Sequence, residues 1–532
     1  MKKFKLQAIL LSAALLVNFS ASSLTTFAEE INEKSNYNNR IEFNDSIGVS
    51  QRLKIDTYED FSNMSDIGLN RGNYHGRESL GFILPANVEF QIRQVNTNLN
   101  KDLTLDLFND DRNTEKSITI PKNGEWVTVS SASLSVPFIR KISGDKVPEV
   151  ELILKGEVNK LPMYREEMNE TTFFKKWDDL DSNFAFIENN RVQMLIPKVD
   201  KKSLRNMNDF SSIDELFKFY NEMFNTYDRL LGLEKNSDNP LHNNVDTQYF
   251  VKADKHGVGA AYYSSNYTAQ NSNSMSAYLG KGWLPLHEVG HGYEYNIKNK
   301  GITLVDIFNN ILAHTYQSTY LKNDEGWLFN GNRLRRDLSM KNVRKSGSYD
   351  SASYQDKLGM FVYLLDFIGE DKFTEFNRLY REKNSTGDLN HKSAITIFNE
   401  LLSEITSYNF IEYFNAYKLK DNTNIIEDES YSKYKNVFIL GDIITDETIS
   451  KKIKDEYGLK SIYSLISTED ILKSNVNVES GNLNITLPKD TISENKVIQL
   501  KDGNNILKEF PIENNGTSNL TNIKPGRYTK TN

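Results

Sequence analysis

Short alternating runs of hydrophobic and polar residues occupy residues 67–158. In Val88–Ile92 and Val150–Leu154 the side chains change character at nearly every second position, and Gly, Asn and Pro separate the runs. A period of two is typical of strands that bury one face, so this region is predicted to be a β-sandwich accessory domain. Two roles are open for it: a module that guides glycans or substrate, or a structural cap on the next domain.

From about residue 159 the apolar residues recur at spacings of three and four, which predicts helices as far as residue 420. A sustained pattern runs from Ile213 to Leu233, with Gly232 as a stop signal. Shorter apolar runs, Tyr249–Val251 and Ala260–Tyr263, predict strands. Further helices are predicted over 303–320, 354–368, 372–381 and 394–406, so residues 159–420 are expected to form a mainly helical domain.

The pattern changes again beyond residue 421. An apolar stretch, Tyr434–Ile443, precedes a predicted helix at Glu447–Tyr457, and Val476–Tyr528 alternates like strands with a hairpin turn at Lys501–Gly503. Residues 421–532 are therefore predicted to form a small C-terminal α/β or β module. The fold class expected for the whole chain is multidomain α+β.

The first 28 residues have the features of an export signal. Lys2, Lys3 and Lys5 precede an apolar run, and small residues ending at Ala28 offer a cleavage site. The apolar run is about 12 residues long, whereas a membrane span needs about 20, so no membrane span is expected. We expect secretion after removal of the signal near Ala28, followed by a polar leader or linker over residues 29–66.

The net charge and the lack of cysteine limit the partners and the reactive groups that the chain can use. The net charge of −8 argues against nucleic acid as a partner. The chain has no cysteine, which removes thiolates from the candidate metal ligands and nucleophiles. A secreted chain without disulfides must rely on packed cores and metal, which suits a bacterial exoprotein.

The most informative motif is HEVGH at residues 287–291. Histidines four residues apart lie on one helical face, so the imidazoles of His287 and His291 can bind one zinc ion. Glu288 lies between them, where it can take a proton from a metal-bound water. A chance match is the alternative, but Pro285 suits the first helical turn and apolar neighbours can bury the helix.

Catalytic zinc usually has three protein ligands, and three residues are candidates for the third. Glu294 is close to His291 along the helix, where a residue that orients a ligand is the commoner case. His314 lies on a mostly apolar helix, where histidines are usually core or surface residues. Asp306 is a charge among apolar residues, which is costly unless it has a partner such as a metal.

The motif and its surroundings resemble the enhancin-like, mucin-degrading zinc metallopeptidases of peptidase family M60. That family carries HExGH and a downstream Glu in a Glu-x-x-Asn-Asn setting, and here Asp306 precedes Asn309-Asn310. The resemblance implies His287, His291 and Asp306 as zinc ligands and Glu288 as catalytic acid and base. Aspartate is shorter than the family's glutamate, so its helix must come closer to the metal.

The resemblance extends to the C-terminal region. Residues 427–528 are similar to a module assigned to mucin or carbohydrate binding, and we expect this module to be truncated because the chain stops four residues after Tyr528. Glycans are accordingly expected to bind through accessory modules.

The expected function is that of a secreted zinc endopeptidase that cleaves mucin-type or other glycosylated proteins. His314 and Tyr316 are candidates to stabilise the oxyanion, and an edge strand before the metal helix can hold an extended peptide. Two alternatives are a mucin- or glycan-binding adhesin with an impaired catalytic site and a general secreted metallopeptidase without glycan preference.

Overall fold

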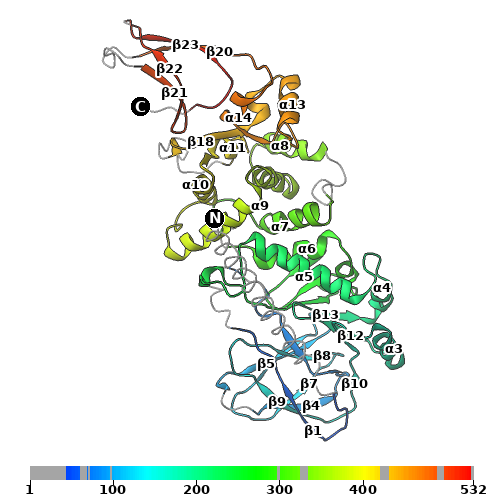
Figure 1. Cartoon of the computed structure of the whole chain (residues 1–532). Helices are drawn as coiled ribbons and strands as arrows, with labels where there is room; N and C mark the ends of the chain where they lie inside the picture. Colours follow the sequence, from blue (N-terminus) through cyan, green and yellow to red (C-terminus); the bar gives the residue numbers. More distant parts are fainter. Residues whose placement is uncertain are drawn as a thin grey trace, which may run out of the picture.

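The chain forms a mixed α/β structure whose parts follow one another along its long axis, from N-terminal strands through helices to C-terminal hairpins (Figure 1). The computed structural model describes residues 43–59, 69, 72–95, 99–295, 297, 300–323, 334–417, 419, 431–487, 497–513 and 515–528. The predicted signal peptide lies outside these residues. Among the helices of the described residues, none combines the length and apolar character needed to cross a bilayer.

Two four-stranded antiparallel sheets form the N-terminal part, with strand orders β1-β9-β4-β7 and β2-β8-β5-β6. Side chains such as Phe90, Leu105 and Leu152 point between the sheets and are fully buried in one core. The alternating runs therefore form the strands that their period predicts. The strands are β1 (Ser50–Lys54), β2 (Arg77–Ser79), β4 (Glu89–Gln94), β5 (Leu103–Phe108), β6 (Lys116–Ile120), β7 (Val127–Ser130), β8 (Val136–Arg140) and β9 (Glu149–Leu154).

The expectation of a linker over residues 29–66 is wrong at β1. This strand pairs antiparallel with β9, and Ser50 lies opposite Ile153. Its side chains are exposed or half-buried, because β1 lies at the edge of its sheet. An edge strand with a solvated face needs few apolar residues. The polar sequence of β1 therefore shows no alternating pattern from which a strand could be predicted.

The sandwich shares a second apolar core with the sheet that follows it. Phe108 and Phe138 of the sandwich pack against Phe250, with ring centroids 5.3 and 5.2 Å away. Within the sandwich, the buried Arg77 pairs with Asp106 at 2.9 Å and also donates to a backbone carbonyl of the next part. The sandwich is therefore joined to the central sheet by a continuous buried contact, as expected for a structural cap.

The central sheet has six strands in the order β11-β12-β13-β14-β16-β15. Both strands predicted here are formed, as β14 (Tyr249–Ala253) and β15 (Ala261–Tyr263). The expectation of a mainly helical domain missed the four others. Two of them, β12 and β13, are buried on both faces and show no alternation. The remaining strands are β11 (Met163–Arg165), β12 (Phe184–Glu188), β13 (Val192–Pro197) and β16 (Thr268–Gln270), and a two-stranded sheet joins β3 (Phe82–Ile83) to β10 (Asn159–Lys160).

Helix α5 (Ile213–Leu230) supports the helix that carries the HEVGH motif. Ser212 caps its first turn by accepting a hydrogen bond from Glu215 N. The buried Tyr227 donates a hydrogen bond of 3.0 Å to Leu286 O, which joins the two helices. The other helices of this region are α3 (Glu170–Leu180), α4 (Lys201–Arg205), α6 (Trp283–Gly290), α7 (Phe308–Thr315), α8 (Leu334–Ser346), α9 (Tyr354–Thr386), α10 (Ala394–Thr406) and α11 (Ile411–Ala416).

One predicted helix begins later than expected, and two others are separated where the pattern indicates. The helix expected over 303–320 begins only at Phe308 and continues beyond Thr315 as a π-helix, Tyr316–Tyr320. The two helices expected over 354–368 and 372–381 are both formed within α9, and they are separated by a break at Gly369, where φ is 78° and ψ is 165°. A positive φ is readily adopted by glycine, so the kink is allowed without strain.

The predicted boundary at residue 421 is crossed by a sheet. Strand β17 (Tyr408–Asn409) pairs with β18 (Lys435–Ile439), which pairs with β19 (Leu465–Ser467). Val437 and Leu465 join the core of the preceding helices, so this segment is packed onto them. The remaining elements are α12 (Leu440–Ile443), α13 (Glu447–Glu456), α14 (Thr468–Lys473), and the paired strands β20 (Gly481–Thr486) with β23 (Thr517–Ile523) and β21 (Val497–Asp502) with β22 (Asn505–Pro511).

Candidate metal centre

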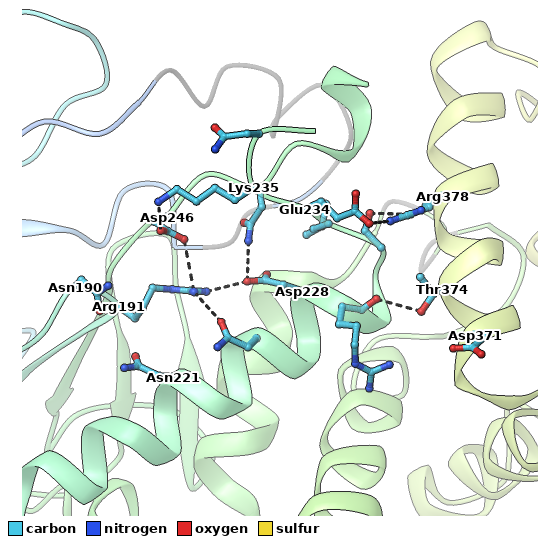
Figure 2. Close-up of a pocket in the computed structure, with 16 residues that line it drawn as sticks. Asn190, Arg191, Asn221, Asp228, Glu234, Lys235, Asp246, Asp371, Thr374 and Arg378 are labelled. Atoms are coloured by element: carbon cyan, nitrogen blue, oxygen red, sulfur yellow. Dashed lines mark hydrogen bonds and ion pairs between the residues drawn. The ribbon is translucent and has the colours of Figure 1, made fainter. Parts of the chain in front are cut away.

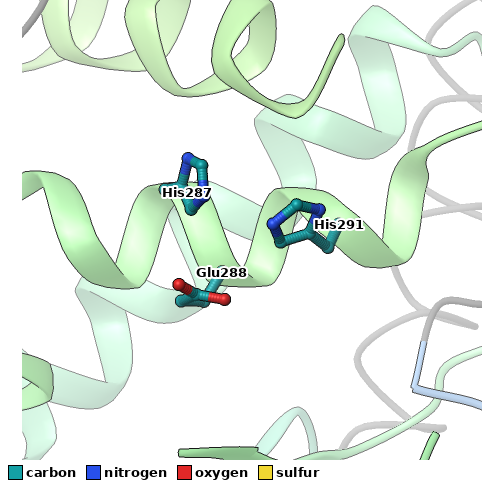
Figure 3. Close-up of side chains that lie close together, drawn as sticks. All are labelled: His287, Glu288 and His291. Carbon is teal, nitrogen blue, oxygen red and sulfur yellow. The ribbon is translucent and has the colours of Figure 1, made fainter. Parts of the chain in front are cut away.

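Helix α6 presents the HEVGH motif, and a 3₁₀ turn, His291–Tyr293, continues it. Leu286 and Val289 are fully buried and fix the helix against the core. The imidazoles of His287 and His291 therefore face the same side, with ring centroids 4.8 Å apart (Figure 3). The candidate ligand atoms of these two histidines and Glu288 all lie within 4.8 Å of one another.

Asp306 converges on the same point from outside the helix. Its Oδ1 lies 3.5 Å from His287 Nε2 and 3.3 Å from His291 Nε2. Hydrogen bonds with the imidazoles of His287 and His291 hold the pKa of Asp306 well below its usual range, so the carboxylate is ionised. Two imidazole nitrogens and one carboxylate oxygen thus meet, which is the donor set of a catalytic zinc site.

The backbone explains how an aspartate reaches this point. Asp306 lies in the turn before α7 and not on a helix as expected, and its φ is 60°. Aspartate tolerates this left-handed conformation better than most residues. The turn therefore brings the short side chain to the imidazoles.

The Nδ1 atoms of both histidines have partners that orient the rings. Asn310 Oδ1 lies 2.6 Å from His287 Nδ1, and Glu294 Oε2 lies 3.3 Å from His291 Nδ1. Acceptors at Nδ1 favour the tautomer whose Nε2 lone pair is free for a metal. Burial opposes protonation of His291, but Asp306 and Glu294 outweigh it and raise its pKa to about 9.

The close approach of α6 and α7 depends on Gly290. A Cβ at this position would lie 3.0 Å from both Cβ and O of Asn309. Across this contact Asn309 donates a 3.1 Å hydrogen bond to His287 O. Within its own segment, Asn310 donates one of 2.6 Å to Asp306 O. The glycine of the motif and the two asparagines therefore link the histidines to the turn that holds Asp306.

Glu288 is buried beside the two imidazoles. Its Oε2 has no hydrogen-bond partner among the described residues. Burial raises the pKa of this carboxyl group, while the neighbouring His287 and His291 partly oppose the rise. A carboxylate with a raised pKa is suited to accept and return a proton near neutral pH.

The other candidate site residues, Glu294, His314 and Tyr316, lie in different surroundings. Glu294 contacts His291, as described above. His314 is buried on α7, and Tyr316 packs against Phe219, with ring centroids 5.9 Å apart. The oxyanion role expected for His314 and Tyr316 stays a prediction.

Edge strand β15 lies beside α6, and a tyrosine from it contacts both the centre and the sandwich. The ring centroid of Tyr263 is 6.4 Å from that of His291. Its hydroxyl accepts a hydrogen bond of 2.9 Å from Gly72 N, on the N-terminal side of the chain. The sequence pattern predicted the strand but not this contact, which depends on the packing of distant segments.

The amino-acid sequence is similar to one protein family and to viral proteins. The family profile described as "Peptidase M60, enhancin and enhancin-like" matches residues 160–418. A viral-enhancing factor of Trichoplusia ni granulosis virus is 26% identical over 492 residues, covering 86% of this chain and 53% of the viral protein. The chain thus spans about half the length of this relative.

Solved structures share the fold at low sequence identity. The ZmpB metallopeptidase from Clostridium perfringens has a TM-score of 0.55 at 14% identity, covering 72% of this chain and 81% of that one. The M60 catalytic domain of ZmpC from the same organism, in complex with the sialyl T antigen, also has a TM-score of 0.55, at 12% identity and with coverages of 72% and 80%. The family match identifies residues 160–418 as a peptidase M60, enhancin-like domain, and the solved structures show the same fold.

Proposed function

We propose that the protein is a secreted zinc endopeptidase that cleaves mucin-type or other glycosylated proteins. The observation that carries this proposal is the convergence of His287 Nε2 and His291 Nε2 on Asp306 Oδ1 beside a buried Glu288. Family membership supports metallopeptidase chemistry, and the proposal adds the metal, the mode of cleavage and the substrate.

The donor set fits zinc on chemical grounds. Neutral imidazole and carboxylate are common ligands of catalytic zinc, and three of them leave a position open. The contacts of Asn310 and Glu294 at Nδ1 aim both Nε2 atoms at Asp306, which is held as an anion. A zinc ion would take the place of the proton that Asp306 and Glu294 favour on His291. A zinc ion bound there would supply Lewis acidity toward the scissile carbonyl and an attacking water.

Glu288 would move the proton that peptide hydrolysis requires. Its unpartnered Oε2 can accept a proton from water and then return it to the leaving amine. Strand β15, at the edge of the sheet, offers backbone groups to an extended substrate. This chemistry would need no nucleophilic side chain, because the attacking group is water.

The glycoprotein substrate is inferred from similar proteins. The neighbouring ZmpC catalytic domain was solved with the sialyl T antigen, a glycan, bound to it. We infer that this chain also recognises glycosylated segments. Digestion of one glycoprotein with and without its O-glycans tests this point, and equal rates would favour a general peptidase.

Exchange of Glu288 for Gln tests the mechanism. The amide keeps the shape of the side chain but cannot accept the proton, so we expect bound zinc to be retained and cleavage of purified mucin to fall by at least about a thousandfold. Fragments would be measured by gel electrophoresis and zinc by elemental analysis. Cleavage at the wild-type rate by Glu288→Gln would exclude this mechanism, and absence of activity in a zinc-loaded wild type would favour the adhesin.

A further inference from the structure

A polar cavity of about 880 Å³ lies outside the metal centre. The second half of α5, the loop that follows it and the second half of α9 contribute to its walls (Figure 2). None of the proposed metal ligands, nor Glu288, lines it. Its volume is within the range of about 300–1,000 Å³ that is usual for small-molecule sites.

The cationic groups of the cavity are already neutralised. Arg191 Nη2 lies 2.9 Å from Asp228 Oδ2. Lys235 Nζ lies 3.3 Å from Asp246 Oδ2, and Arg378 pairs with Glu234. A fourth cation, Arg229, pairs with Glu370 at 2.5 Å. An anionic ligand would have to compete with these ion pairs, so the cavity disfavours anions.

The cavity also offers hydrogen-bonding groups that are not engaged elsewhere. The side chains of Asn190, Asn236 and Asp371 make no hydrogen bond or ion pair with other described residues. Asn225 is exposed and is bonded only weakly, at 3.4 Å from Arg191 Nη1. Each amide combines a donor and an acceptor, which matches neighbouring hydroxyl groups on a ligand.

The wall of the cavity is held rigidly. The side chains of Arg191 and Asp228 are 8% and 6% exposed, and Asn244 donates a 2.9 Å hydrogen bond to the same carboxylate oxygen. The other oxygen of Asp228 accepts a 2.9 Å bond from Tyr293, at the end of the turn that begins with His291. A preorganised wall loses little entropy on binding.

We propose that this cavity is a second binding site, for a neutral saccharide, separate from the metal centre. A polyhydroxylated, uncharged ligand is the class that satisfies the free amides and leaves the ion pairs intact. The site would bind a glycan of a glycoprotein while another segment lies at the metal centre. The binding itself does not require peptidase activity.

Titration with lactose, a neutral disaccharide, tests the proposal. Binding would be measured by saturation-transfer NMR and calorimetry on the full chain, with the anionic analogue lactobionate alongside. Asn225→Trp places a bulky ring at the cavity wall, and Asn206→Trp makes the same exchange at an exposed asparagine outside it. Asp371→Leu, which removes an exposed and unpaired carboxylate, is a second blocking variant less able to disturb α5.

We expect saturable lactose binding in the wild type and Asn206→Trp, and at least tenfold weaker binding in both blocking variants. Lactobionate should bind more weakly than lactose. His287→Ala should bind lactose as the wild type does, so the result stands even if the peptidase proposal fails. Absence of saturable binding, equal affinity in the blocking variants or loss of binding in His287→Ala would overturn the proposal.

Discussion

At the scale of single residues, the conformation of Asp306 determines which side chain can serve as the third ligand. Its φ of 60° is a conformation that aspartate tolerates and glutamate does not favour. The carboxylate already lies 3.3 and 3.5 Å from the two imidazole nitrogens. A glutamate at this position would therefore strain the backbone, and its longer side chain would place the carboxylate too close to the two imidazoles.

We predict that Asp306→Glu weakens zinc binding, on the order of tenfold, although related enzymes are expected to carry glutamate here. Competition with a chelator measures this affinity. Asp306→Asn is the matched control, because it keeps the backbone preference and removes the charge, so it should lose zinc without loss of thermal stability. Zinc binding by Asp306→Glu that equals or exceeds wild type would contradict the argument.

At the scale of elements, the centre depends on the contact between α6 and α7. Gly290 allows Asn309 to approach, and the neighbouring asparagine links His287 to the backbone of Asp306. We predict that Gly290→Ala pushes α7 away, lowers the free energy of unfolding by about 1–3 kcal/mol and weakens zinc binding. Denaturant unfolding and chelator competition measure the two effects.

Gly282→Ala provides the control for that experiment. Gly282 caps α6 at its N-terminus with a φ of −69°, and a Cβ there would meet nothing within 4 Å. Its zinc affinity should equal that of the wild type. If Gly290→Ala also kept full affinity and stability, the packing of α6 on α7 would not set the geometry of the centre.

At the scale of the whole molecule, the sandwich is joined to the catalytic part by buried polar groups as well as apolar ones. His75 is fully buried, and one ring nitrogen lies 2.7 Å from Ser264 O, across the junction. Burial lowers the pKa of His75 to about 3. The unfolded chain binds a proton at this residue near pH 6.5, and the folded chain does not.

This difference predicts that stability falls with acidification. Between about pH 6.5 and 3 the unfolded state holds the extra proton, so His75 lowers the free energy of unfolding by up to about 1.4 kcal/mol per pH unit. Denaturant unfolding at pH 7 and 5.5 measures the slope. His75→Gln, whose amide can still donate to Ser264 O, should show a shallower slope, and an unchanged slope would rule out His75 as its source.

Much of this architecture could be predicted from periodicity, because helices such as α5 and α10 bury one stripe of side chains. Strands β12 and β13 could not, since burial on both faces removes the alternation. The motif predicted which residues face one another on α6. The turn at Asp306 and the contact of Asn310 with His287 could not be predicted from periodicity or from the motif, because they depend on how two helices pack.

The proposed peptidase requires His287, His291 and Asp306 to hold one zinc ion together. Elemental analysis of the purified full chain, beside His287→Ala and Asp306→Ala, tests it most directly. We expect about one zinc per chain in the wild type and substantial loss in both variants, with the fold retained. A wild type without zinc, or an Asp306→Ala variant that holds zinc as tightly as the wild type, would contradict it.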